Sequence, residues 1–103
     1  MGVPFSEEII RERLRDVLDP ELRLSVVDLG LIYDIAVAGD TVHVTYTLTT
    51  PACPIGPVIA AQIREAVMDI PGVRDVEHIL TFRPPWDPRT MASEDARIEL
   101  GIW

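Results

Sequence analysis

Apolar residues recur at the spacing of an amphipathic helix in two stretches of the chain. The first stretch follows Ser6, a residue type that favours the N-cap of a helix, and its apolar positions are Ile10, Leu14, Val17 and Leu18. We expect this helix to end at Asp19, because the residue before a proline avoids the α region. The second stretch follows Cys53 and has a wide apolar face made of Ile55, Ile59, Ile63, Ala66, Val67 and Ile70. Its first regular turn should begin between Pro54 and Pro57, and Pro71-Gly72 should end it.

Alternation of apolar and polar residues predicts three strands. Residues 31–37 and 41–49 flank the turn Gly39-Asp40 and should pair as an antiparallel hairpin. In the second of these strands, His43 and Thr47 fall on the polar face. Residues 73–82 form the third predicted strand, in which His78 falls on the face that should meet the core.

The remaining segments complete one small domain. Residues 19–30 lack a sustained period, and their apolar residues predict an ordered connection. Ser93 should cap a last helix that runs to Leu100 and stops at Gly101. The predicted fold class is therefore α/β of the α+β type, with the order α-β-β-α-β-α in a single domain, 1–103. Its three-stranded mixed sheet is covered by helices, and its crossover is right-handed.

Composition narrows the classes of function. The 103 residues carry a formal net charge of −8, and all nine basic residues are arginine. Nucleic acid and anionic membranes are poor partners for such a chain, because phosphate contacts need a positive surface. No apolar run approaches a membrane span. A single cysteine makes no internal disulfide, which agrees with a cytoplasmic setting.

Cys53 lies where the second strand runs into the second helix, in Thr47-Leu-Thr-Thr-Pro-Ala-Cys-Pro54. The unpaired N–H groups and partial positive charge at a helix start favour an anion, so a cysteine at this place should ionise more easily than a free one. The alternative is that Cys53 is a small buried side chain, as free cysteines often are. The sequence pattern alone leaves both interpretations open.

The other reactive side chains do not form a recognised catalytic or metal-binding arrangement with Cys53. A thiol hydrolase needs a histidine base, and His43 should lie roughly 20 Å back along its strand. His78 is patterned as a structural core residue, and Trp86 as a residue that closes the core edge. The spacings of a structural zinc site are absent. If Cys53 binds a metal or a cluster, it must share it with a second copy, another protein or a small thiol.

Five motifs in order resemble the SufT/PaaD-like family of iron–sulfur assembly proteins. They are Asp19-Pro-Glu21, Ser25-Val-Val-Asp-Leu-Gly-Leu-Ile-Tyr33, Thr47-Leu-Thr-Thr-Pro-Ala-Cys-Pro54, Pro71-Gly-Val73 and Leu80-Thr-Phe-Arg-Pro-Pro-Trp86. The likeness covers nearly the whole chain. The resemblance implies a cytoplasmic α/β domain that helps to mature or deliver iron–sulfur clusters and is not an enzyme in the strict sense. Relatives in phenylacetate degradation carry a cysteine-rich tail, which this chain lacks, so the general assembly role is the better match.

The resemblance also implies the site and its partners. Cys53 corresponds to the family's reactive cysteine, and the other motif positions that would line the same cleft are Asp19, Glu21, Asp28, Thr49 and Thr50. We expect no tightly bound cofactor, but a transient iron–sulfur cluster held by Cys53. Expected partners are scaffold or carrier proteins and recipient apo-proteins, with a homodimer when two Cys53 thiolates share a cluster. Two alternatives remain open: an interaction adaptor whose thiol is dispensable, and a small thiol enzyme.

Overall fold

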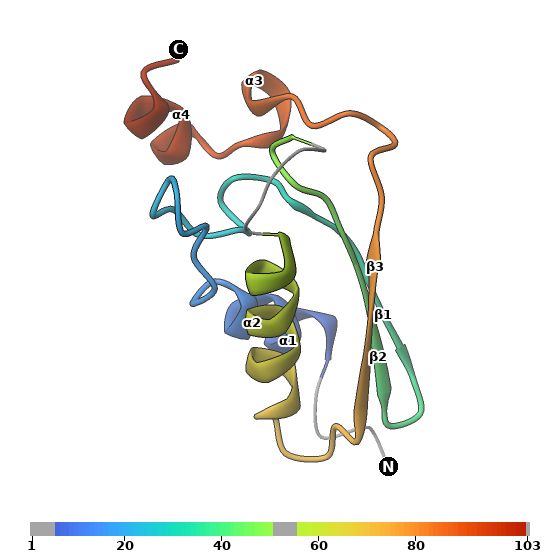
Figure 1. The fold of residues 1–103 in the computed structure, drawn as a ribbon. Coiled ribbons are helices and arrows are strands. Elements are labelled where there is room, and N and C mark those ends of the chain that lie inside the picture. Colours follow the sequence, from blue (N-terminus) through green and yellow to red (C-terminus); the bar gives the residue numbers. More distant parts are fainter. Residues whose placement is uncertain (1–5, 51–55, 103) are drawn as a thin grey trace.

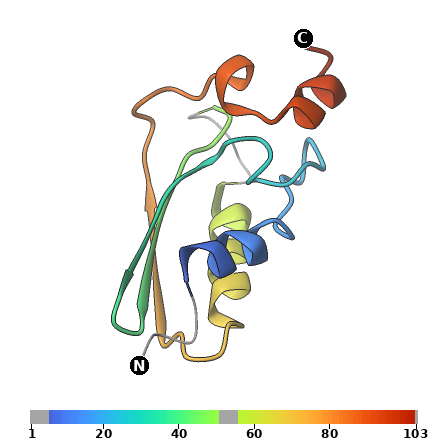
Figure 2. The ribbon, with the colours of Figure 1, turned by 180° about the vertical axis from the view of Figure 1, so that it is seen from behind.

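The computed structural model describes residues 6–50 and 56–102, which form a three-stranded sheet with two helices on one of its faces (Figure 1). In chain order the elements are α1 (Glu7–Leu14), β1 (Ile32–Ala38), β2 (Thr41–Tyr46), α2 (Gly56–Met68), β3 (Asp75–Leu80), α3 (Pro88–Met91) and α4 (Glu94–Leu100). The view from behind shows α1 and α2 on the same side of the sheet, with α3 and α4 beyond one of its ends (Figure 2). The predicted α+β class is confirmed.

Strand β2 is the centre of a mixed sheet with the order β1-β2-β3. It pairs antiparallel with β1, which confirms the predicted hairpin, and parallel with β3, as a connection through α2 requires. Val42, Val44 and Tyr46 on β2 are buried on the face that the helices cover. Ile59, Ile63 and Val67 of α2 and Ile10 and Leu14 of α1 complete the centre of this core.

Helix α1 ends at Leu14, before the predicted limit at Asp19. The cause is a pairing that the local sequence does not reveal. Leu18 forms an antiparallel bridge with Ser25, and the amide of Val26 donates to the carbonyl of Val17 at 2.9 Å. The chain from residue 15 to residue 31 is thus a folded-back connection, as expected for an ordered segment, but it begins earlier than the proline indicated.

Strands β2 and β3 are shorter than their patterns, β1 is shifted by one residue, and the predicted face of His78 is wrong. A bulge in β1 lies between Ile32 and Asp34, so Ile32 and Ile35 share the buried face. His78 was expected against the core but is exposed, although Val76 on the same face of β3 is buried. The helices therefore cover only the first half of β3.

The C-terminal segment adds one helix that the pattern did not reveal, α3, which Asp87 caps. Helix α4 matches its prediction: Ser93 caps its start, and Gly101 ends it with a left-handed φ of 78°. The Trp86 side chain packs against the core and donates from Nε1 to the carbonyl of Leu29 at 2.7 Å, as expected for a residue at the core edge. Within residues 6–50 and 56–102, no helix has the length and apolarity to cross a membrane.

Candidate functional site

Three connecting segments meet at the end of the sheet where β2 and β3 finish. The amide of Thr47 donates to the carbonyl of Leu31 at 2.8 Å, which holds the end of β2 beside the start of β1. The amide of Thr81 donates to the carbonyl of Tyr46 at 2.9 Å, which holds the segment after β3 on the other side. The described parts of three motifs, in residues 25–33, 47–50 and 80–86, therefore converge here.

Cys53 lies outside the described residues, but the residues on both sides of its segment are in place. Leu48 follows β2 and is buried, and Gly56 opens α2 and is also buried. A Cβ built on Gly56 would lie 2.9 Å from Leu48 Cδ1, so glycine allows the helix start to approach the strand end closely. The first turn of α2 holds no acidic residue, and its positive end is therefore not neutralised from within the helix.

Asp19 is a buried carboxylate that organises the connection before β1. It is 1% exposed, and its Oδ1 accepts hydrogen bonds from the amides of Glu21 at 2.8 Å and Leu22 at 3.1 Å. Its own amide donates to the carbonyl of Leu24 at 2.9 Å. This is the Asx-turn geometry that short polar side chains favour in loops. Asp19 therefore has a structural role in the described part of the chain, which is separate from its expected role in lining the cleft.

The two other predicted acids differ from Asp19 in their surroundings. The Glu21 side chain is exposed. Asp28 is half-buried, and its Oδ1 lies 3.1 Å from Nη1 of Arg15, while its carbonyl accepts from the amide of Ser93 at 2.7 Å. Asp28 thus joins the end of α1 to the start of α4. The described contacts place each of the three predicted acids in the same connection but do not join their carboxylates to one another.

The threonines after β2 include a residue that the sequence pattern placed wrongly. Thr49 is half-buried and Thr50 is exposed. Thr47 was expected on the polar face but is fully buried, and its Oγ1 has no hydrogen-bond partner in the described part of the chain. A buried hydroxyl without a partner is unusual, because losing water without gaining a hydrogen bond costs about 1–3 kcal/mol. In the sequence, only the abundance of threonine in this stretch pointed to Thr47.

Two tyrosines border this end of the sheet. Burial raises the pKa of Tyr46 above its ordinary value. Burial also raises the pKa of Tyr33, and the proximity of the Thr47 hydroxyl lowers it to a smaller extent. That proximity does not amount to a well-formed hydrogen bond, since the Tyr33 hydroxyl donates to the carbonyl of Pro84 at 2.7 Å. Both tyrosines are therefore neutral at physiological pH.

The histidines do not assemble with the predicted acids. His43 Nδ1 lies 3.0 Å from Glu77 Oε2 on the face of the sheet that the helices leave uncovered. His78 contacts the ring of Tyr46 edge-on, with 6.3 Å between the ring centroids. Among the described residues, no group of three or more histidine, cysteine, aspartate or glutamate side chains could hold a metal ion.

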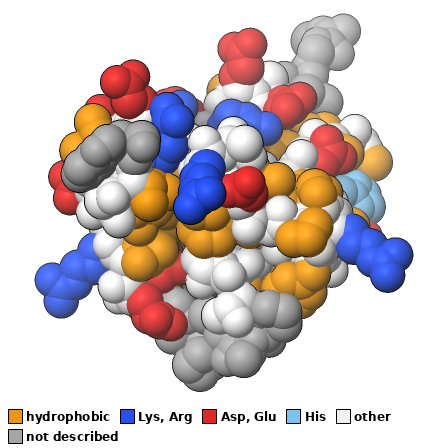
Figure 3. Space-filling model, turned by 90° about the horizontal axis from the view of Figure 1, so that it is seen from above, with side chains coloured by type: hydrophobic (Ala, Val, Ile, Leu, Met, Phe, Trp, Pro, Cys, Tyr) orange, Lys and Arg blue, Asp and Glu red, His pale blue; other side chains and the backbone are white. Residues whose placement is uncertain are grey.

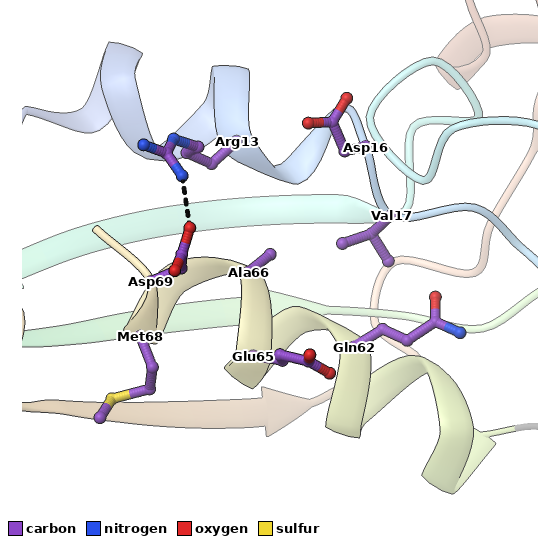
Figure 4. Close-up of a pocket in the computed structure, with 8 residues that line it drawn as sticks. All are labelled: Arg13, Asp16, Val17, Gln62, Glu65, Ala66, Met68 and Asp69. Atoms are coloured by element: carbon purple, nitrogen blue, oxygen red, sulfur yellow. Dashed lines mark hydrogen bonds and ion pairs between the residues drawn. The ribbon is translucent and has the colours of Figure 1, made fainter.

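A hollow of about 720 Å³ lies elsewhere, between α1 and α2 (Figure 4). The ion pair between Arg13 Nη1 and Asp69 Oδ2, at 2.9 Å, spans it. The other residues that line it are Asp16, Val17, Gln62, Glu65, Ala66 and Met68. Neither a thiol nor an imidazole is among these lining residues, so we place the candidate site at the end of β2 and not in this hollow.

The surface at that end of the sheet is mixed in character. Figure 3 looks down on it and shows hydrophobic side chains exposed at several places, with acidic and basic side chains between them. No broad basic area is seen on this face. A large positive surface for nucleic acid is thus not visible here, in agreement with the acidic composition.

Comparisons with known proteins point to one family. Residues 7–78 match the sequence profile of a family described as "Iron-sulfur cluster assembly protein". The chain is 41% identical over 101 residues to the "Fe-S protein maturation auxiliary factor YitW" of Bacillus subtilis, covering 93% of this chain and 98% of that protein. It is 46% identical over 98 residues to an "Fe-S protein maturation auxiliary factor" of Porphyromonas gingivalis, covering 94% and 92%.

Solved structures agree in fold. A conserved hypothetical protein of Thermotoga maritima superposes with a TM-score of 0.85 at 41% identity, covering 99% of this chain and 100% of that chain.

The chain also matches an "Iron-sulfur cluster carrier protein" of Synechocystis at 49% identity over 72 residues. That match covers 70% of this chain but 20% of the carrier, so it relates this domain to one part of a longer protein.

Proposed function

The chain belongs to the iron–sulfur cluster assembly protein family, and from this premise we propose that it is an accessory factor in the maturation of iron–sulfur proteins. Relatives that match nearly their full length are named as maturation auxiliary factors, which supports this role. The cluster is the cargo, and the partners are the scaffold or carrier proteins that supply it and the apo-proteins that receive it.

In this proposal, Cys53 holds the cargo transiently as a thiolate. The observation that carries the proposal is the close contact between Leu48 and Gly56, which brackets the segment of Cys53 between the end of β2 and the start of a 13-residue helix. A helix start favours an anionic sulfur and lowers the pKa of a thiol. One thiolate does not complete the coordination of a cluster, so a partner or a second copy supplies the remaining ligands.

The polar residues around the junction have supporting roles. Asp19 holds the turn that shapes the connection before β1, through its bonds to the amides of Glu21 and Leu22. Thr49 and Thr50 lead from β2 toward Cys53, where hydroxyl groups can donate hydrogen bonds to sulfur ligands. Asp28 fixes the position of the same connection through Arg15.

Anaerobic reconstitution with iron and sulfide tests the role of the thiol. We expect the wild type to take up a labile cluster, seen by absorbance, and to activate an apo-protein that needs a [4Fe–4S] cluster, while Cys53→Ser should do neither. The matched control is the double variant His43→Gln, His78→Gln, which removes both imidazoles and should behave as the wild type.

The outcomes separate the alternatives. If Cys53→Ser loads and delivers as well as the wild type, the thiolate is not a ligand and this mechanism is refuted. If neither protein takes up iron, yet both speed delivery from a carrier protein to an apo-protein, the domain is an adaptor. A wild type that neither loads nor assists delivery would refute the accessory role itself.

A further inference from the structure

Two arginines line one hollow in the C-terminal segment, one from α3 and one from α4. The hollow has a volume of about 460 Å³, and the described residues that line it are Arg89, Arg97, Gly101 and Ile102. No carboxylate is among these described residues. Gly101 is exposed, and a Cβ built on it would meet no atom within 4 Å, so the hollow is open to solvent beside this residue. A volume of this size is in the range that holds a small molecule.

The charges of these two arginines are not balanced by acids. The arginines that pair with a carboxylate in residues 6–50 and 56–102 are Arg11, Arg13, Arg15, Arg64 and Arg74. Arg89 and Arg97 form no ion pair with a carboxylate of the same residues. Acidic partners are abundant in a chain with a net charge of −8, so two unpaired cations at one hollow are unusual. Like charges repel each other, and an anion that binds between them removes this repulsion.

The guanidinium of Arg97 has a buried donor without a partner. Its Nε is buried and makes no hydrogen bond in the described part of the chain. Its Nη1 lies 3.5 Å from the carbonyl oxygen of Arg89, which is at the limit of a hydrogen bond. A buried donor without an acceptor destabilises a folded protein and calls for a physical explanation, and an acceptor supplied by a ligand is one. The hydrogen-bonding capacity of this guanidinium is thus largely unused within the chain.

We propose that Arg89 and Arg97 bind the phosphate group of a small molecule. Guanidinium groups supply paired N–H donors that match the oxygens of a phosphate, and such charge-assisted bonds are about twice as strong as neutral ones. A phosphate monoester carries about 1.5–2 negative charges at pH 7, so one group balances both arginines. The inference goes beyond the proposed function, since it requires neither Cys53 nor a cluster.

The surroundings of the hollow favour a compact anion over an acidic protein. The end of α4 carries partial negative charge, but its carbonyls are engaged within the chain. That of Arg97 accepts from the amide of Ile102 at 2.9 Å, and that of Ile98 accepts from the amide of Gly101 at 3.0 Å. The net charge of −8 repels an acidic protein surface over its whole area, whereas a small anion meets the two arginines at contact distance.

Calorimetric titration of the iron-free protein with inorganic phosphate tests the site, against sodium chloride at equal ionic strength. We expect binding of phosphate but not of chloride, with a dissociation constant that rises at least tenfold in Arg89→Gln. The matched control is Arg74→Gln, which removes the same charge from a side chain that is 82% exposed and lies beside Asp40 of the hairpin turn. Equal weakening in the two glutamine variants, or no binding of phosphate beyond that of chloride, would overturn the proposal.

Arg97→Met gives a second readout, which separates binding from a structural role. Methionine removes the buried donor that lacks an acceptor, so the anion-free variant should melt at a higher temperature than the wild type. The same variant should lose most of the rise in melting temperature that phosphate gives to the wild type. A lower melting temperature of the anion-free variant, or a phosphate effect as large as that of the wild type, would contradict this role of Arg97.

Further ligands distinguish the sources of the phosphate group. If AMP binds at least tenfold tighter than inorganic phosphate, the site takes a nucleotide, and if AMP binds no tighter, it takes free phosphate; both results support the proposal. Succinate that binds as tightly as phosphate would overturn the assignment to phosphate. Binding of a glutamate-rich peptide without binding of phosphate would refute it in favour of an acidic partner segment. Loss of cluster loading in Cys53→Ser leaves these measurements unaffected, so the two proposals fail separately.

Discussion

Gly30→Ala should destabilise the protein more than a glycine substitution at a turn. Gly30 has a φ of +79°, a region that costs an L-residue roughly 1–2 kcal/mol. A Cβ at this position would also lie 2.6 Å from the carbonyl carbon of Met91, and closer still to its oxygen. Backbone atoms must then move, which typically costs about 1–3 kcal/mol more. We therefore expect the free energy of unfolding to fall by about 2–5 kcal/mol.

The matched control is Gly39→Ala, at the hairpin turn. Its φ of +65° is similar, but no atom lies within 4 Å of a Cβ at that position. Only the cost of the left-handed backbone, about 1–2 kcal/mol, should appear. Urea unfolding followed by circular dichroism measures both variants. If the two substitutions cost the same, the close approach of α3 to Gly30 contributes nothing and the reasoning fails.

Two further changes test the polar groups near the site. Burial raises the pKa values of Tyr46 and Tyr33, so as pH rises the unfolded chain loses these tyrosine protons before the folded protein does. The free energy of unfolding should therefore be unaffected by these groups below about pH 10 and should fall as pH rises above it. Tyr46→Phe should flatten that fall in urea unfolding, with Cys53→Ser as the background, and an unchanged slope would contradict the burial argument. Asp19→Ala leaves two loop amides without their acceptor, so it should lower the free energy of unfolding by about 1–3 kcal/mol. Asp19→Asn should lower it less. Equal stability of Asp19→Ala and the wild type would show that the turn does not depend on the carboxylate.

Local signals in the sequence predicted the elements whose stability is local. The hairpin follows from alternation around Gly39-Asp40, and α4 follows from a capping serine and a terminal glycine. The end of α1 could not be predicted in this way, because the bridge between Leu18 and Ser25 competes with further helical turns. A contact of this kind depends on tertiary pairing and leaves no periodic trace.

The sequence indicated the end of β2 as the place of a candidate site, which stays a prediction, but it did not indicate the contacts there. Motif residues and helix-start chemistry both indicated the end of β2, where the described segments do converge. The turn at Asp19 and the burial of Thr47 depend on how the connection before β1 folds against the sheet, which no single residue type encodes. The reactivity of Cys53 stays a prediction.

The hydrogen bond from Trp86 to the carbonyl of Leu29 has a consequence for the order of events during synthesis. Its two ends are 57 positions apart. At about 5–20 residues per second, a ribosome makes the connection before β1 roughly 3–11 s earlier than the tryptophan that covers it. During that interval the nascent chain can form the hairpin, but Trp86 cannot yet cover the connection before β1. A chaperone that binds exposed apolar loops would therefore meet this connection on the ribosome and lose access to it as the C-terminal segment emerges.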